Sequence, residues 1–335
     1  MDVGPPVYFV TEDVNVTARA GQQALCGRFS ICDDQSVANI LEAQRKQSDS
    51  SFLAEPPAVW LDDFFQWLNP ALDTCCRVRR NDHNIFCGPN ESESRCMPCY
   101  EAESQQWNVS MEGLPQGDKF MRYLEQWLQS PTDEACPLGG QAPYSSAISL
   151  KSAHSVTASH FRTYHTPLKS QADFIDAMAA ANRVAEDLSK TSDGHVYPYS
   201  VFYVFFDQYA TITATTRQVL FLALLAVFAM TSFMLGSFRT GAVVAWTTFM
   251  SVMMVMGIMG LWNISLNAVS LVNLVISIGI SVEFCSHIAR AFMGALGGGL
   301  PYDHPSGPKE RDERAWVALA DVGSSVSLFA ITKPT

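Results

Sequence analysis

The run VLFLALLAVFAMTSFML, Val219–Leu235, decides the architecture because it contains no charged residue and almost no polar one. The charge-free stretch around it extends from Gln218 to Phe238, and a second extends from Thr240 to Val282. The second stretch is too long for a single crossing at about 20 residues per helix, and it divides at Trp262-Asn263. We therefore predict three transmembrane helices, near residues 218–238, 241–261 and 266–288.

The rest of the chain has a different composition. Residues 1–216 contain 27 acidic and 15 basic residues, whereas residues 217–335 contain 6 and 7. Eight of the nine cysteines lie in the first part. The net charge of −11 argues against a nucleic-acid partner. The low charged fraction, 16%, excludes disorder for most of the chain.

The basic residues predict the orientation. Arg239 lies in the short loop after the first span, and further basic residues follow the third. The positive-inside rule places these loops in the cytosol, which puts residues 1–216 on the lumenal side. Residues 294–314 are expected to form a cytosolic linker rich in Gly and Pro, and residues 315–335 to begin a fourth, truncated span.

Cysteines and sequons agree with a lumenal domain. The eight cysteines predict a disulfide framework, although the sequence alone allows 105 pairings. Half of a zinc site at Cys96-Met-Pro-Cys99 is the alternative, but no second pair stands at zinc-finger spacing. We expect no metal and no cofactor. The sequons at Asn15, Asn90 and Asn108 predict N-glycosylation.

Residues 1–216 are predicted to form an α+β domain. Val7–Val10 is typical of a strand, and Ser36, Asp118 and Ser170 are candidate helix caps. Strand-like runs at Val156–Thr166 and Val196–Phe206 flank the helix after Ser170, which predicts a β-α-β unit of ferredoxin-like type. No catalytic constellation is present in the sequence of this domain, so we expect a protein that is not an enzyme.

The third span carries two sets of polar residues. At 100° per residue one set follows a single line of the helix, and it comprises Asn267, Ser270, Asn273, Ser277 and Ser281. Gly279, Glu283 and His287 share a roughly opposite face. With polar groups on two faces, this helix is expected to present no broad apolar face to lipid and to sit centrally among other helices.

Glu283 and His287 are spaced i, i+4 and can form a hydrogen bond. An intramembrane carboxylate beside a histidine indicates a proton or ion relay. The alternative is an interfacial anchor, because Glu283 lies about 27 Å along the helix from Ser265, near the cytosolic interface. Spacing alone leaves both interpretations open.

Several stretches resemble the Niemann-Pick type C sterol transporter family, which belongs with Patched and the resistance-nodulation-division transporters. They are GPPVYFV (4–10), CCRV (75–78), PYSVFYVFFDQY (198–209), the third span (265–292) and GSS (323–325). The segment ISVEFCSHI (280–288) is the most specific of them. The chain resembles the C-terminal third of such a protein.

The resemblance implies a lumenal ferredoxin-related domain that packs against a sister domain. It also implies the pairing Cys26–Cys32, Cys75–Cys136, Cys76–Cys99 and Cys87–Cys96. Gly279-Ile-Ser-Val-Glu283 is similar to the family's GxxxE motif, which faces a GxxxD motif in the other half of the protein and is thought to couple cation flux to sterol movement.

The expected function is that of the C-terminal part of a sterol transporter in the lysosomal or vacuolar membrane, which moves cholesterol or ergosterol from the lumen to the membrane. The expected partners are sterol, membrane lipid and the N-terminal half of the transporter, with a soluble lumenal sterol carrier reached only through that half. A Patched-like receptor or lipid exporter is one alternative. A membrane-anchored fragment without transport is the other.

Overall fold

The computed structural model describes residues 3–72, 74–88, 91–92, 94–103, 107, 112–134, 136–152, 155–192, 194–294, 311–312 and 314–323. The chain divides into two compact units, Met1–Phe206 and Asp207–Thr335. The first unit has α+β architecture, and the second consists mainly of three long helices.

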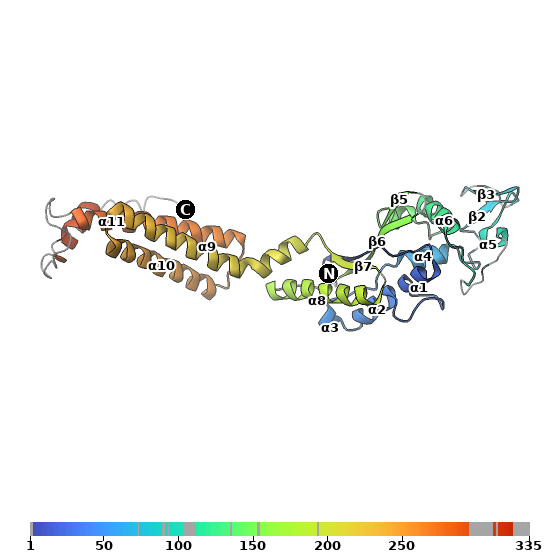
Figure 1. Cartoon of the computed structure of the whole chain (residues 1–335), viewed down its shortest axis with the longest axis horizontal. Helices are drawn as coiled ribbons and strands as arrows, with labels where there is room; N and C mark the ends of the chain where they lie inside the picture. Colours follow the sequence, from blue (N-terminus) through green and yellow to red (C-terminus); the bar gives the residue numbers. More distant parts are fainter. Residues whose placement is uncertain are drawn as a thin grey trace. The chain divides into compact units, whose positions relative to one another are not determined.

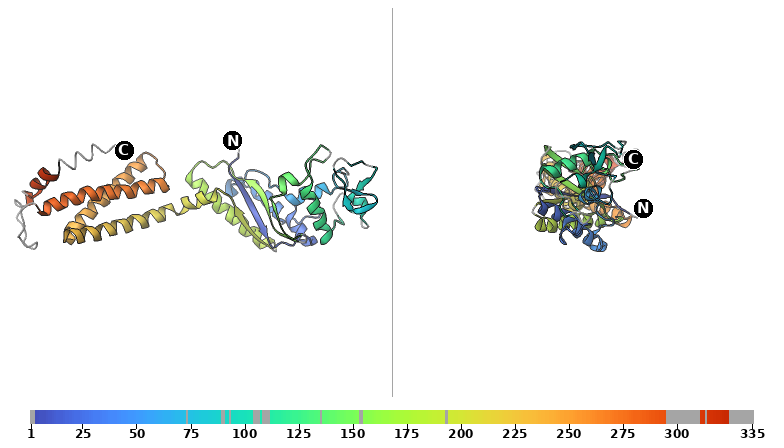
Figure 2. Two further views of the ribbon diagram at one scale, coloured as in Figure 1. Left: turned by 90° about the horizontal axis from the view of Figure 1, so that it is seen from above. Right: turned by 90° about the vertical axis from the view of Figure 1, so that its right-hand side faces the viewer.

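A four-stranded antiparallel sheet organises the first unit. Its strands are β1 (Pro6–Glu12), β5 (Ile148–Ser152), β6 (Ser155–Tyr164) and β7 (His195–Tyr199), in the order β5-β6-β1-β7. Helix α8 (Gln171–Thr191) connects β6 to β7, and β1 lies between these two strands (Figure 2). The predicted β-α-β unit is therefore present in its split form.

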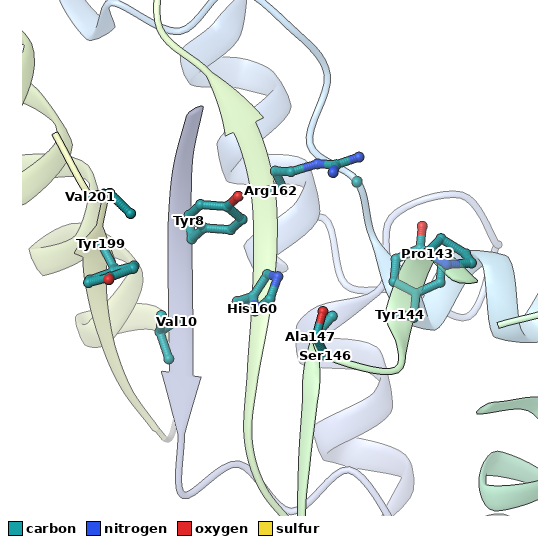
Figure 3. Close-up of a pocket in the computed structure, with 11 residues that line it drawn as sticks. Tyr8, Val10, Pro143, Tyr144, Ser146, Ala147, His160, Arg162, Tyr199 and Val201 are labelled. Atoms are coloured by element: carbon teal, nitrogen blue, oxygen red, sulfur yellow. The ribbon is translucent and has the colours of Figure 1, made fainter. Parts of the chain in front are cut away.

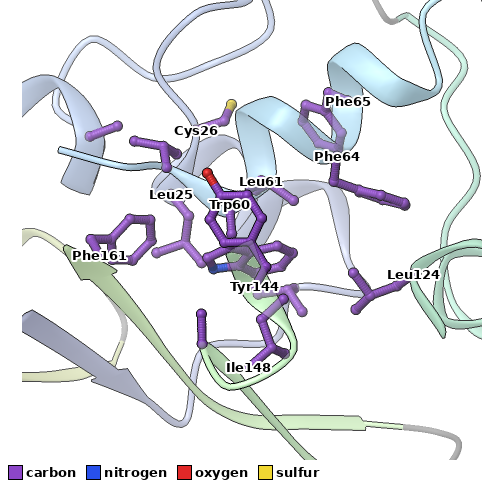
Figure 4. Close-up of a cluster of buried hydrophobic side chains, with 14 of the residues drawn as sticks. Leu25, Cys26, Trp60, Leu61, Phe64, Phe65, Leu124, Tyr144, Ile148 and Phe161 are labelled. Carbon is purple, nitrogen blue, oxygen red and sulfur yellow. The ribbon is translucent and has the colours of Figure 1, made fainter. Parts of the chain in front are cut away.

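The sheet buries one face, as the alternation of β1 dictates. Val7, Phe9 and Thr11 are buried, whereas Tyr8 and Val10 between them are only partly covered. On the buried side, α4 (Trp60–Trp67) and α6 (Asp118–Gln129) contribute an aromatic cluster that includes Trp60 and Phe64 (Figure 4). The shorter helices are α1 (Arg19–Leu25), α2 (Val37–Arg45), α3 (Ser48–Ser51), α5 (Cys99–Ala102) and α7 (Gln141–Tyr144).

Two of the three predicted caps are confirmed. The Ser36 side chain accepts a hydrogen bond from the Asn39 amide at the start of α2. Ser170 and Asp173 form a reciprocal capping box on α8. The cap predicted at Asp118 is wrong: Gly117, at φ +61°, is the N-cap of α6, and Asp118 lies in the first turn.

A small disulfide-linked sheet projects from the first unit (Figure 1). It consists of β2 (Arg77–Arg79), β3 (Asp82–Phe86) and β4 (Cys96–Pro98) in the order β3-β2-β4. The disulfides of the first unit are Cys26–Cys32, Cys75–Cys136, Cys76–Cys99 and Cys87–Cys96. This is the pairing that the resemblance implies. Because Cys96 and Cys99 are both oxidised, they are not half of a zinc site.

The three long helices are α9 (Tyr203–Leu235), α10 (Phe238–Leu261) and α11 (Ala268–Gly294), each long and apolar enough to cross a membrane. Helix α9 begins at Tyr203, well before residue 218, where the first span was predicted to start. The strand predicted over Val196–Phe206 is therefore shorter and ends at Tyr199. At about 1.5 Å per residue α9 is about 50 Å long, which exceeds the ~30 Å hydrocarbon core. Its charge-free part after Arg217 is the segment that fits the bilayer.

Close packing holds the three helices of the second unit together. Gly241 of α10 lies against Ser232 of α9 so closely that a Cβ atom there would overlap the serine side chain. Val252 of α10 packs with Leu274 and Ile278 of α11, and α10 and α11 lie side by side (Figures 1 and 2). Residues 314–323 are helical, whereas 324–335 and most of the predicted linker lie outside the described residues.

Candidate functional site

Helix α11 begins with a reciprocal cap. The Asn267 side-chain Oδ1 accepts a hydrogen bond from the Ser270 amide at 2.9 Å, and the Asn267 amide donates to Ser270 Oγ at 2.8 Å. These two residues therefore satisfy backbone groups at the start of the helix. The sequence interpretation, which placed both on a polar face against another helix, missed this role.

One face of α11 is covered and the opposite face is open. Ser270, Leu274 and Ile278 are buried, the latter two against α10. The open face carries apolar side chains with large exposed fractions, namely Val269, Val272, Ile276 and Ile280. Within the described residues no helix covers this face, so the central position of α11 among other helices stays a prediction. Helical periodicity shows which residues share a face, but it does not show which face a neighbour covers.

Gly279, Glu283 and His287 lie on this open face. Apart from its own helix, no atom of the described residues stands within 4 Å of the position that a Gly279 Cβ atom would take, and both Glu283 and His287 are exposed. Among the described residues the carboxylate and the imidazole form no hydrogen bond with each other. Ser286 Oγ donates a hydrogen bond to the Glu283 backbone carbonyl at 3.0 Å.

This arrangement has a clear chemical consequence. A carboxylate on the apolar face of a membrane helix is costly unless a partner group or water meets it. The open space at Gly279, one turn before Glu283, allows another helix to approach closely. The face therefore has the shape and polarity of a helix-contact surface that carries two titratable groups.

A second candidate site lies on the open face of the sheet in the first unit (Figure 3). It is a hollow of about 330 Å³, and Tyr8, His160, Arg162 and Tyr199 line it from three adjacent strands. Tyr8 and His160 pack edge to face with ring centroids 4.9 Å apart. Burial and the Arg162 charge lower the pKa of His160. The sequence interpretation missed this site, although the alternation of β1 already placed Tyr8 opposite the core.

A buried histidine of the first unit lies beside Tyr203, the first residue of α9. His165 is fully buried, its Nδ1 lies 3.1 Å from the Phe52 carbonyl oxygen, and its Nε2 lies 2.9 Å from the Tyr203 hydroxyl. Because the carbonyl only accepts, Nδ1 carries the proton and Nε2 accepts from Tyr203. Burial lowers the pKa of His165 to about 4, against a smaller opposing effect of the Phe52 carbonyl. The imidazole is therefore neutral above that pH.

The structure describes one of the three predicted glycosylation sites. Asn15 is exposed on the loop between β1 and α1. Asn90 and Asn108 lie outside the described residues.

Comparison with known proteins identifies relatives along the chain. No protein-family model matches it. The chain is 40% identical over 342 residues to the pig NPC intracellular cholesterol transporter 1, a match that covers 99% of this chain and 25% of that protein. It is 33% identical over 305 residues to the rat NPC1-like intracellular cholesterol transporter 1, covering 87% of this chain and 22% of the relative.

A more distant match covers the chain equally well. The Drosophila melanogaster NPC intracellular cholesterol transporter 1 homolog 1b is 30% identical over 344 residues, which is 99% of this chain and 26% of that protein. The chain thus spans about a quarter of the length of these relatives. Over nearly its whole length, the chain is a homologue of the NPC1 family of intracellular cholesterol transporters.

Proposed function

We propose that the chain is the C-terminal portion of an intracellular sterol transporter that moves sterol from the lumen of the lysosome or vacuole into the membrane. The observation that carries the proposal is the uncovered α11 face with Gly279, Glu283 and His287, in a chain homologous to named cholesterol transporters. Sterol and membrane lipid are the proposed ligands, and the N-terminal half of the transporter is the proposed partner.

In this proposal Glu283 takes up and releases a proton or binds a cation, and His287 one turn later tunes its charge. Helices of the other half of the transporter cover the open face and approach it closely at Gly279. The interfacial-anchor alternative explains a charge near the helix end. It gives no reason for Glu283 to share one face with an open glycine and an imidazole.

We also propose that the first unit is a lumenal ferredoxin-like module. The strand order β5-β6-β1-β7, with α8 connecting β6 to β7, supports it. The disulfides support an oxidising, lumenal compartment. The open sheet face, with the hollow beside Tyr8 and Tyr199, is the surface that we assign to contact with a sister domain.

The experiment is sterol clearance from lysosomes or vacuoles by the full-length protein. We expect Glu283→Gln to slow clearance at least about tenfold, because a relay needs its titrating group. Glu283→Asp is expected to restore part of the rate. Val269→Ala, on the same open face but without charge, is the matched control. Wild-type clearance by Glu283→Gln, with normal protein abundance, would refute the relay.

A further inference from the structure

A second hollow of the first unit, of about 380 Å³, plays no part in the proposed transport. Its walls are the loop after β1 and the first residues of β6. The lining residues are Asp13, Val14, Asn15, Val16, Thr17, Ser155, Val156 and Thr157. One of them, Asn15, is the acceptor of the sequon Asn15-Val16-Thr17. A cavity is thus lined by a residue to which an N-linked glycan can be attached.

The Asn15 side chain is held in a defined orientation. Its Oδ1 accepts hydrogen bonds from Thr17 Oγ1 at 2.7 Å and from the Thr17 amide at 3.2 Å. Its Nδ2, the atom that a glycan modifies, makes no hydrogen bond within the described part of the chain. The exposed side chain therefore presents Nδ2 to an incoming reagent while Oδ1 stays fixed.

The loop that carries Asn15 is anchored on both sides. Val16, the next residue, is 2% exposed and belongs to the core. Gly21 of α1 lies so close to the Asn15 carbonyl that a Cβ atom would overlap it. The Asp13 amide donates to the Thr157 carbonyl oxygen at 3.4 Å, which joins the two walls of the hollow. A sugar attached at Asn15 therefore begins at a fixed position beside this hollow.

The walls have the chemistry that an amino sugar requires. Val14 and Val156 are half-buried and offer apolar surface for the C–H face of a pyranose ring. The Asp13 carboxylate and the Ser155 hydroxyl are exposed and can bond to ring hydroxyls and to an acetamido N–H. We propose that Asn15 carries an N-linked glycan and that its first N-acetylhexosamine occupies this hollow, bridging the β1–α1 loop and β6.

The modification balances as a group transfer from a lipid-linked oligosaccharide diphosphate. Asn15 Nδ2 bonds to the sugar C1, the C1–O bond to the lipid diphosphate breaks, and the amide loses one proton. A lumenal glycosyl transferase of the host catalyses this step. The inference thus rests on the proposed lumenal placement of the first unit, because the donor and enzyme act on that side of the membrane.

The first measurement is glycan occupancy at Asn15, by glycopeptide mass spectrometry of the protein from a eukaryotic host. We expect the glycan in wild type and in Thr17→Ser, and none in Thr17→Ala or Asn15→Gln. If the disulfides are formed but Asn15 carries no glycan, this inference is overturned and the lumenal placement is not. Free cysteines together with no glycan would overturn the lumenal placement as well.

The second measurement tests whether the first N-acetylhexosamine occupies the hollow. An amidase that cleaves N-glycans is applied to the native protein, and release at Asn15 is followed over time. Val156→Glu, which puts a charge in the apolar wall, is expected to speed release at least about fivefold, as expected when a covered bond is uncovered. Val156→Ile is the matched control and is expected to keep the wild-type rate. Equal rates for wild type and Val156→Glu would show that the glycan does not occupy the hollow.

Discussion

The two units of this chain are stabilised in different ways, although one helix runs from the first into the second. The first unit buries a continuous aromatic core and adds four disulfides. The second unit buries only short rows of side chains between its helices and exposes large apolar residues. The hydrophobic effect in water favours burial of the apolar side chains of the first unit, whereas lipid would solvate the exposed apolar side chains of the second. Stability in the two units should therefore respond to different substitutions.

The largest effect is expected from disulfides, and it should be confined to the first unit. Cys75–Cys136 closes a separation of 61 residues, whereas Cys26–Cys32 closes one of 6. On the chain-entropy model, replacing both cysteines by Ser should lower the free energy of unfolding by about 4 kcal/mol for the long loop and about 2 kcal/mol for the short one.

The measurement is denaturant unfolding followed by tryptophan fluorescence, with Cys285→Ser as the matched control because this thiol is free. An equal loss for the two loops would contradict the entropic account.

The next effect is a pH dependence that arises from His165. Its pKa is about 4 in the folded protein and near 6.5 when unfolded, so the unfolded state binds more protons between these values. The contribution to stability should fall as pH drops below 6.5 and level off below 4, a total of about 3 kcal/mol at 1.4 kcal/mol per pKa unit.

Thermal unfolding between pH 4 and 7.5 provides the measurement. His165→Gln, which has no titrating ring, should flatten the slope in this window even if it lowers stability at every pH. An unchanged slope in that variant would assign the pH dependence to other groups.

In the second unit, a substitution at the contact between α9 and α10 tests stability more directly than a substitution of the exposed apolar residues. Gly241→Ala would force the helices apart, because the added methyl group overlaps Ser232. Overpacking of this kind costs about 1–3 kcal/mol. Gly257→Ala in the same helix meets no neighbouring atom of the described residues within 4 Å and is the matched control. The check is heat stability in detergent, and equal values for the two variants would mean that the contact does not hold α9 to α10.

The smallest effect is expected at the start of α8. Ser170→Ala removes the hydrogen bond that the side chain accepts from the Asp173 amide at 3.1 Å, and loss of an N-cap costs about 1 kcal/mol. Ser170→Asn retains a capping oxygen and should keep nearly all of the stability. Chemical denaturation of both variants measures the difference. If both lose the same amount, the cap is not what stabilises the helix.

Much of the architecture was predictable because its signals are local. Absence of charge indicated the spans, and polar residues before Val37 and Gln171 marked helix starts. The start of α9 was not predictable in this way. The aromatic residues from Tyr203 onward are typical of a strand, but Tyr203 bonds to the distant His165 at 2.9 Å. Such long-range contacts outweigh local propensity.

The candidate sites, too, depend partly on local sequence patterns and partly on long-range contacts. The shared face of Gly279, Glu283 and His287 follows from helical geometry alone. That this face is the uncovered one depends on the packing of Leu274 and Ile278 against α10, which no local pattern encodes. The hollow near Tyr8 requires three strands that are distant in sequence, so it could only emerge from the folded sheet.

The contrast between the units is tested most directly by counting free thiols in the denatured, unreduced protein. Eight cysteines of the first unit are paired, and Cys285 in α11 is the single free thiol. Alkylation followed by mass spectrometry should therefore label one thiol per chain, at Cys285. Labelling at several cysteines of the first unit would contradict both its oxidised framework and the lumenal location that we propose for it.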